Sequence, residues 1–225
     1  MHPLYKKAFG ALLILVLVVA SLLFIAAGTL RYWQGWTFLV IYFACSLAIT
    51  LYLMKADPAL LARRMSGGPL AEKQLRQKII MSIASLGFIG LLVVPALDHR
   101  LSWSAVPPAA VFAGDALMVL GFLGVFLVFR ENSFTSATIE LADDQKVIST
   151  GPYALVRHPM YAAALVMLLG IPLSLGSWWG ILVMAAIVPA VIWRLLDEEK
   201  FLARSLSGYV AYQDSVRYRL LPLIW

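Results

Sequence analysis

Long stretches without a formal charge constrain this chain more than any other feature. The run Ala8–Leu30 holds 23 residues without a charged side chain and follows Lys6 and Lys7. About 20 apolar residues are enough for a helix to cross the hydrocarbon core of a bilayer. A secretory signal has a shorter apolar region that ends at a small-residue cleavage site. We therefore expect a retained first membrane span.

Further apolar runs follow at Tyr32–Met54, Ile79–Leu97, Val106–Phe129 and Pro159–Trp193. The last run is 35 residues long, more than one ordinary span needs. The turn residues and tryptophans of "SLGSWWG" divide it into helices near 159–174 and 178–196. We predict an all-α, polytopic membrane protein with five to six transmembrane helices. The last two form a short helical hairpin, followed by a cytoplasmic, helical C-terminal tail.

Composition supports one integral membrane domain over residues 1–225. Hydrophobic residues make up 62% of the chain and charged residues 13%, with a mean hydropathy of +0.86. Residues 1–129 hold four spans, and we expect the catalytic region in 130–225, where the polar residues gather. The net charge of +6 does not indicate a nucleic-acid partner, because the basic residues lie between apolar runs.

Cysteine and histidine are scarce. Cys45 is the one cysteine, and the three histidines are His2, His99 and His158. The sequence therefore predicts neither a disulfide framework nor a metal site.

Basic residues predict the orientation. With six segments, 16 of the 18 Lys and Arg residues fall on the side that carries both termini, and only Arg31 and Arg100 fall opposite. The positive-inside rule then places the N- and C-termini in the cytoplasm. Asp115 is the one acid inside a span, near the outer face, and few other polar residues support a channel or an ion-coupled transporter.

Polar chemistry gathers after residue 129. Two stretches carry most of it: "STGPYALVRHPMY" at 149–161 and "WRLLDEEKFL" at 193–202. Pro159 suits the first turn of a helix, which puts His158 at its cap and Tyr161 in its first turn. The free N–H groups of that turn and Arg157 favour an anion, such as the carboxylate of an amino-acid-like cofactor. Alternatively, Arg157 and His158 only anchor the helix at the headgroups.

The second stretch places Arg194 and Glu198 on one helix face, with Glu199 about 100° round. This group predicts a site for a cationic ligand or for orienting a substrate carboxylate. The alternative is a solvated helix end with a weak ion pair. The tail aromatics Tyr209 and Tyr212 look interfacial, as in a segment that lies along the membrane surface.

Together, "TGPYALVRHPMY", "WRLLDEE" and "GYVAYQDSVRYRLLP" resemble the isoprenylcysteine carboxyl methyltransferase family and the related membrane phospholipid methyltransferases. The resemblance covers roughly Arg130–Pro222. It implies a membrane methyltransferase that uses S-adenosylmethionine on a lipophilic substrate at the cytoplasmic face. The acceptor it favours is a prenylcysteine-type carboxylate, and the partners are that lipid and the membrane lipids.

Site residues follow from the same resemblance. It implies catalytic roles for Arg194 and Glu198, and pocket positions for Asn132 and Phe134. It implies the following cofactor contacts: Tyr153, Arg157, His158, Pro159, Tyr161 and Glu199. One departure is visible, since the family usually has glycine where this chain has Ala163.

Three alternatives remain open. A phospholipid amine N-methyltransferase would need a base, for which His158 or Glu198 would have to serve. An NADPH-dependent sterol-type reductase is more distant, and the acid pair Glu198–Glu199 argues against it. A non-catalytic membrane scaffold with a relic pocket is the third alternative. A prenylcysteine carboxylate needs no base, because a carboxylate is ionised at neutral pH.

Overall fold

The computed structural model describes residues 3–72, 74–139, 141 and 144–225, and the described chain is helical. Its α-helices and two short 3₁₀ turns follow one another in this order: α1 Pro3–Ala27, α2 Trp33–Ala56, α3 Pro58–Arg64, η1 Pro69–Ala71, α4 Leu75–Leu101, α5 Pro108–Glu131, η2 Gly151–Ala154, α6 Pro159–Ser174, α7 Trp179–Ser205 and α8 Tyr209–Ser215.

Five of these helices, α1, α2, α4, α5 and α7, are long and apolar enough to cross a membrane. The predicted polytopic all-α fold is therefore confirmed. Helix α6 has 16 residues, roughly 24 Å at 1.5 Å per residue, and is shorter than the others. The expected last helix, 178–196, is too short: α7 continues to Ser205. The charged residues after Leu196 did not end the helix; Glu199 is buried, whereas Lys200 and Arg204 are exposed.

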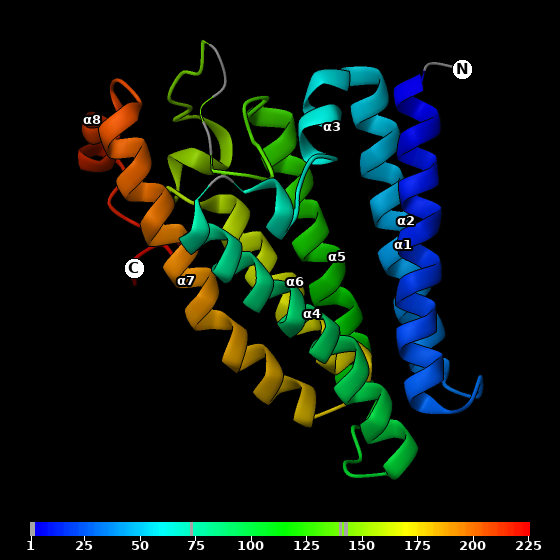
Figure 1. The fold of residues 1–225 in the computed structure, drawn as a ribbon. Coiled ribbons are helices and arrows are strands. Elements are labelled where there is room, and N and C mark those ends of the chain that lie inside the picture. The colour runs from blue at the N-terminus through cyan, green and yellow to red at the C-terminus, as the bar shows by residue number, and fades with distance from the viewer. Residues whose placement is uncertain (1–2, 73, 140, 142–143) are drawn as a thin grey trace.

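The helices form two groups in Figure 1. Helices α4, α5, α6 and α7 pack around one another, and α1 and α2 lie along one side of them. The start of α1, helix α3, the end of α5, the start of α6 and helix α8 lie at one end of the bundle, which we call the pocket end. The α1–α2, α4–α5 and α6–α7 connections lie at the other, the turn end.

Small residues let α5 and α6 pack closely. A Cβ atom added to Gly121 would meet the Met167 backbone at 2.7 Å, and one added to Gly124 would meet the Ala163 Cβ at 2.7 Å. Close approach through small residues is how helices associate where lipid removes the hydrophobic driving force. Ala163 therefore fits because Gly124 faces it, which explains how the chain departs from the family's glycine.

The turn end holds buried polar side chains. Asp98 is 1% exposed and accepts hydrogen bonds from the hydroxyls of Ser104 and Ser177 and from the Ser104 backbone N–H. Asp115 accepts a hydrogen bond from Ser174 at the end of α6. These contacts join the α4–α5 and α6–α7 connections.

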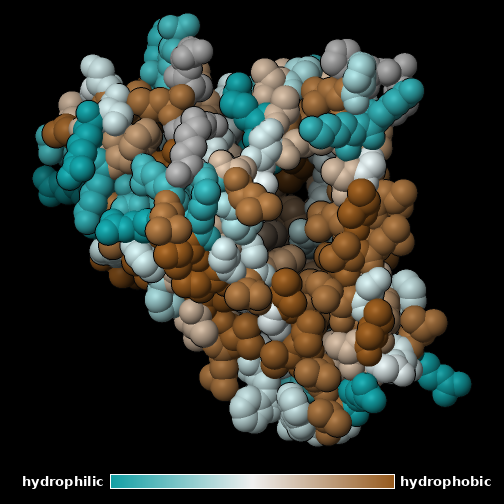
Figure 2. Space-filling view, in the orientation of Figure 1, coloured by the Kyte–Doolittle hydropathy of each residue, from teal (hydrophilic) through white to brown (hydrophobic). Residues whose placement is uncertain are grey.

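The surface matches a membrane environment. Figure 2 shows hydrophobic residues over the middle of the bundle and hydrophilic residues gathered at its ends.

At the pocket end, Asp57 caps α3 by accepting a hydrogen bond from the Leu60 N–H at 2.8 Å, and Pro58 occupies the first helical position. This short helix turns the chain back over the bundle and carries Arg63 and Arg64 at its end.

Candidate active site at the pocket end

A cavity of about 430 Å³ opens at the pocket end, between the ends of α5, α6 and α7, the 132–148 connection and α8. Its volume lies within the range of roughly 300–1,000 Å³ that is typical of small-molecule sites. Nine of the ten site residues that the sequence predicts lie on its wall: Asn132, Phe134, Tyr153, Arg157, His158, Pro159, Tyr161, Arg194 and Glu198. Glu199 is the exception.

The segment before α6 is held by the C-terminal tail. The Arg157 N–H donates to the Tyr218 carbonyl at 2.9 Å, and the His158 N–H donates to the Arg219 carbonyl at 3.0 Å. Pro159 then begins the helix, as predicted, and no side chain caps it. Backbone pairing with the tail therefore fixes where α6 starts.

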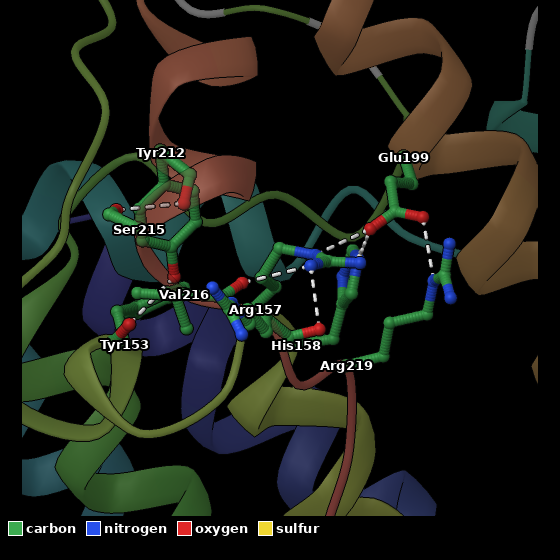
Figure 3. A network of polar contacts seen from close by, with 9 residues as sticks. Tyr153, Arg157, His158, Glu199, Tyr212, Ser215, Val216 and Arg219 are labelled. Atoms are coloured by element: carbon green, nitrogen blue, oxygen red, sulfur yellow. Dashed lines mark hydrogen bonds and ion pairs between the residues drawn. The ribbon is translucent and has the colours of Figure 1, made fainter. Parts of the chain in front are cut away.

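Arg157 and Glu199 are partners in this structure. Arg157 Nε donates to Glu199 Oε1 at 2.7 Å, and Arg219 Nε donates to Glu199 Oε2 at 2.8 Å. Arg157 Nη1 also donates to the Val216 and Arg217 carbonyls at 2.8 and 2.9 Å. Figure 3 shows Arg157 between the Glu199 carboxylate and the backbone of the tail.

This network differs from the expected arrangement. From the sequence, Arg157 was expected to bind an anion and Glu199 was expected to contact the cofactor. In the structure, both Glu199 oxygens accept from arginines, and its carboxylate lies behind Arg157 rather than on the cavity wall. A buried carboxylate needs such partners because desolvation of a lone charge is costly. Arg157 and Glu199 therefore orient the start of α6 and its connection to the tail.

Two buried polar atoms on the wall lack hydrogen-bond partners among the described residues: His158 Nε2 and Tyr209 Oη. Both side chains are 4% exposed, and His158 Nε2 lies 3.6 Å from Glu199 Oε1, beyond normal hydrogen-bond range. Unsatisfied buried polar atoms are uncommon and costly in native proteins. His158 Nε2 faces the Glu199 carboxylate, which lies off the cavity wall, so Tyr209 Oη is the atom of the two that favours a polar ligand in the cavity. Tyr209 was expected at the membrane interface, and that expectation was wrong.

Glu198 and Arg194 also face the cavity, but not as a pair with each other. The Tyr161 hydroxyl donates to Glu198 Oε2 at 2.5 Å. Arg194 lies 2.8 Å from Glu72 Oε1 and donates to Gln77 Oε1 at 2.9 Å and to the Ala137 carbonyl at 3.1 Å. The predicted alternative, a solvated helix end with an Arg194–Glu198 pair, is therefore wrong.

Tyr153 connects two sides of the wall. The Asn132 amide donates to the Tyr153 hydroxyl at 2.9 Å, and the Tyr212 hydroxyl donates to the Tyr153 carbonyl at 2.7 Å. Burial raises the pKa of Tyr153, and it raises the pKa of Tyr212 to about 12 against the opposing charge of Arg157. Both phenols stay neutral donors at physiological pH. Tyr212, expected at the interface, is 5% exposed.

The cavity also has an apolar side. Phe122 and Val125 of α5, Met167 of α6 and Met81 of α4 line it, and these residues belong to the hydrophobic helices. The cavity thus joins a polar region to side chains within the apolar helices. An amphiphilic ligand would match that division.

One wall residue and two residues that support the wall were missed from the sequence. Arg64 contributes to the wall from α3, and Glu72 and Gln77 hold Arg194 from the η1–α4 region. These residues precede the stretch on which the family resemblance depends, so no motif marked them. Arg64 is one of the 16 basic residues on the predicted cytoplasmic side, and this was the one available signal.

The fold is that of a multi-pass helical membrane protein with a cavity at one end of the bundle. Residues 109–207 match the model of a family described as phospholipid methyltransferase. The resemblance predicted from the sequence is confirmed by this match, which indicates a membrane methyltransferase. A search of curated proteins finds no match to the chain.

Proposed function

We propose that the protein transfers a methyl group from S-adenosylmethionine to a lipophilic carboxylate of the prenylcysteine type, at the cytoplasmic face of the membrane. The observation that carries the proposal is the cavity itself, where Arg194, Glu198 and His158 share a wall with Phe122 and Met167. The family match supports methyl transfer over the predicted NADPH-dependent reductase.

The residues present fit the cofactor. Tyr209 Oη supplies a buried polar atom without a hydrogen-bond partner among the described residues, and the uncapped start of α6 favours an anionic group. We assign cofactor contacts to Tyr153, His158, Pro159 and Tyr161, with Arg157 and Glu199 orienting this segment. When bound, S-adenosylmethionine supplies a methyl group on a positively charged sulfur, which leaves as a neutral thioether.

On the acceptor side, Arg194 orients the reacting carboxylate. Its side chain is held by Glu72, Gln77 and the Ala137 carbonyl, so little freedom is lost when a ligand binds. A carboxylate is already ionised at neutral pH, so the site needs no general base. Glu198, held by Tyr161, balances positive charge in the cavity and positions that phenol.

A phospholipid amine is the second candidate acceptor, and the description of the matching family favours it. Methyl transfer to an amine requires loss of a proton, and Glu198 is the acid on the cavity wall that would accept it. His158 is a less direct choice because its ring lies against Glu199.

Orientation follows from charge. In the sequence, 16 of the 18 Lys and Arg residues fall on the predicted side that carries both termini, and such a bias favours the cytoplasmic side. Cysteine labelling of Ser66→Cys and Ser102→Cys in intact and permeabilised cells tests this placement, since these positions lie at opposite ends of the bundle. Labelling of Ser102→Cys alone in intact cells is the expected result.

Binding and product analysis test the activity. We expect S-adenosylhomocysteine to bind the detergent-solubilised protein at micromolar concentration in a calorimeter. Incubation with labelled methyl donor and a lipid extract should yield a base-labile methyl ester. A base-stable N-methyl product would establish the amine acceptor instead, and the lack of nucleotide binding would favour the non-catalytic scaffold.

A further inference from the structure

Arg64 is a cavity residue that neither the family match nor the proposed mechanism assigns. It lies at the end of α3, outside the matched residues 109–207, yet its side chain lines the cavity. The guanidinium lies over the ring of Phe129, 5.2 Å from its centroid, and Nη1 donates to the Ser136 carbonyl at 2.6 Å. Helix α3 therefore brings a cation to a site built mainly by distant segments.

Arg64 and Arg194 converge on one wall. Arg64 donates to the Ser136 carbonyl, and Arg194 donates to the next carbonyl along the chain, that of Ala137, at 3.1 Å. Both guanidinium groups line the cavity. Burial lowers the pKa of Arg64; Tyr161 and Glu198 oppose this shift, and the positive charge of Arg194 adds to it. The positively charged side chains of Arg64 and Arg194 thus lie near each other at the edge of the cavity.

The two arginines differ in their partners. Arg194 has the Glu72 carboxylate at 2.8 Å, whereas within the described ranges no carboxylate lies within 4.0 Å of Arg64. A guanidinium carries five N–H donors in a planar fork suited to carboxylate and phosphate oxygens. The Ser136 bond uses one of them. Arg64 therefore retains both charge and hydrogen-bonding capacity toward the cavity.

We propose that Arg64 is a substrate-binding residue that holds, together with Arg194, the anionic headgroup of the lipophilic acceptor. The proposal rests on the proposed function, because it assigns the acceptor half of the same site. An oxyanion between the two guanidinium groups relieves their repulsion and satisfies their remaining donors. A carboxylate and a lipid phosphate share this chemistry. Helix α3, outside the matched residues 109–207, then contributes to acceptor binding together with Arg194 of α7.

A purely structural role for Arg64 is the competing explanation, since its bond to Ser136 also supports the 132–148 connection. The chain offers a matched control in Arg63, the preceding residue of α3, which donates to the Ser133 carbonyl of the same connection but does not line the cavity. Arg64→Lys keeps the charge and loses the planar fork.

The experiment measures binding of paired probes to the full-length, detergent-solubilised protein by calorimetry. One pair is N-acetyl-S-farnesylcysteine and its neutral carboxamide; the other is dodecyl phosphate and dodecanol. The wild type should prefer the charged member of one pair by about tenfold or more, the size of a charge-assisted hydrogen bond. The preferred pair distinguishes carboxylate from phosphate recognition.

Arg64→Gln should remove most of that preference while the affinity for the neutral probe stays within about twofold. Arg64→Lys should retain part of the preference, and Arg63→Gln all of it. Equal weakening of both probes by Arg64→Gln, or an unchanged preference, would overturn the proposal. S-adenosylhomocysteine is titrated separately, so that a failure of the methyltransferase assignment shows in that titration and not in the probe ratio.

Discussion

The two ends of the bundle both bury charged side chains, but they satisfy them differently. At the turn end, the Asp98 carboxylate accepts from Ser104 and Ser177, and their hydroxyls accept in turn from the Trp178 and Gly180 backbone N–H groups. The donors to Asp98 come from the two connections that the cluster joins. None of these residues lines the cavity.

At the pocket end, the polar side chains are only partly satisfied by the protein. Arg157 and Glu199 form an ion pair with each other. His158 Nε2 and Tyr209 Oη, by contrast, have no hydrogen-bond partner among the described residues. Arg194 and Glu198 are anchored on one side and face the cavity on the other. The comparison teaches that a closed polar cluster stabilises a fold, whereas an incompletely satisfied one beside a cavity is suited to bind a ligand.

Arg194→Ala should give the largest effect. Removal of the group that orients the acceptor is expected to reduce turnover by at least about a hundredfold. Binding of S-adenosylhomocysteine should stay within about twofold, because Arg194 acts on the acceptor side. Radiolabelled methyl transfer and calorimetry on the same preparation measure both. Arg76→Ala serves as control, because Arg76 is exposed and pairs with Asp197. If the control loses as much activity, the pocket end acts as a structural cluster.

Glu199→Gln should weaken S-adenosylhomocysteine binding by about tenfold, the effect of releasing Arg157 and the start of α6 from a charge-assisted contact. The loss acts through position, since Glu199 does not line the cavity. Calorimetry measures it. Glu131→Gln is the matched control, because Glu131 accepts from Thr150 at the same end of the bundle but lies outside the cavity wall. Unchanged affinity in Glu199→Gln would show that the network is not coupled to the cofactor site.

Asp98→Asn should affect stability and leave the site unchanged. An amide presents one acceptor oxygen to the three donors around it, so the change should cost about 1–3 kcal/mol of stability. Thermal unfolding in detergent measures the loss. S-adenosylhomocysteine affinity should stay within twofold of wild type at a temperature where both proteins are folded. A tenfold loss of affinity would break the distinction between the two ends.

Tyr212→Phe should have the smallest effect, about 1 kcal/mol of stability for the lost hydrogen bond to the Tyr153 carbonyl. Burial raises the pKa of Tyr212 to about 12 from about 10 in the unfolded chain. A raised pKa means that this stabilisation is fully present below pH 10 and is lost as the pH rises through 12. Unfolding temperatures at pH 8, 10.5 and 11.5 should therefore fall less steeply in Tyr212→Phe than in the wild type.

Much of the molecule could be predicted from local sequence. Runs free of charge located α1, α2, α4 and α5 to within about five residues, because hydropathy and length decide whether a helix can cross a bilayer, but they missed the end of α7 by about nine. Proline at 159 located the start of α6, since proline is favoured at the first position of a helix. The motif residues were expected near one another, and the structure places all but Glu199 on one wall.

Three features came only from the tertiary structure, and each joins residues far apart in the chain. Adjacent carboxylates differ in role because α7 turns Glu198 toward the cavity and Glu199 toward Arg157 and the tail. Tyr209 and Tyr212 are buried because α8 folds back on the site. Arg64 lies on the cavity wall because α3 turns over the bundle. The sequence by itself determined which segments lie in lipid and which hold charge, since transfer from water is a local property. Packing between distant segments decided which of those charges are satisfied by the protein and which remain for a ligand.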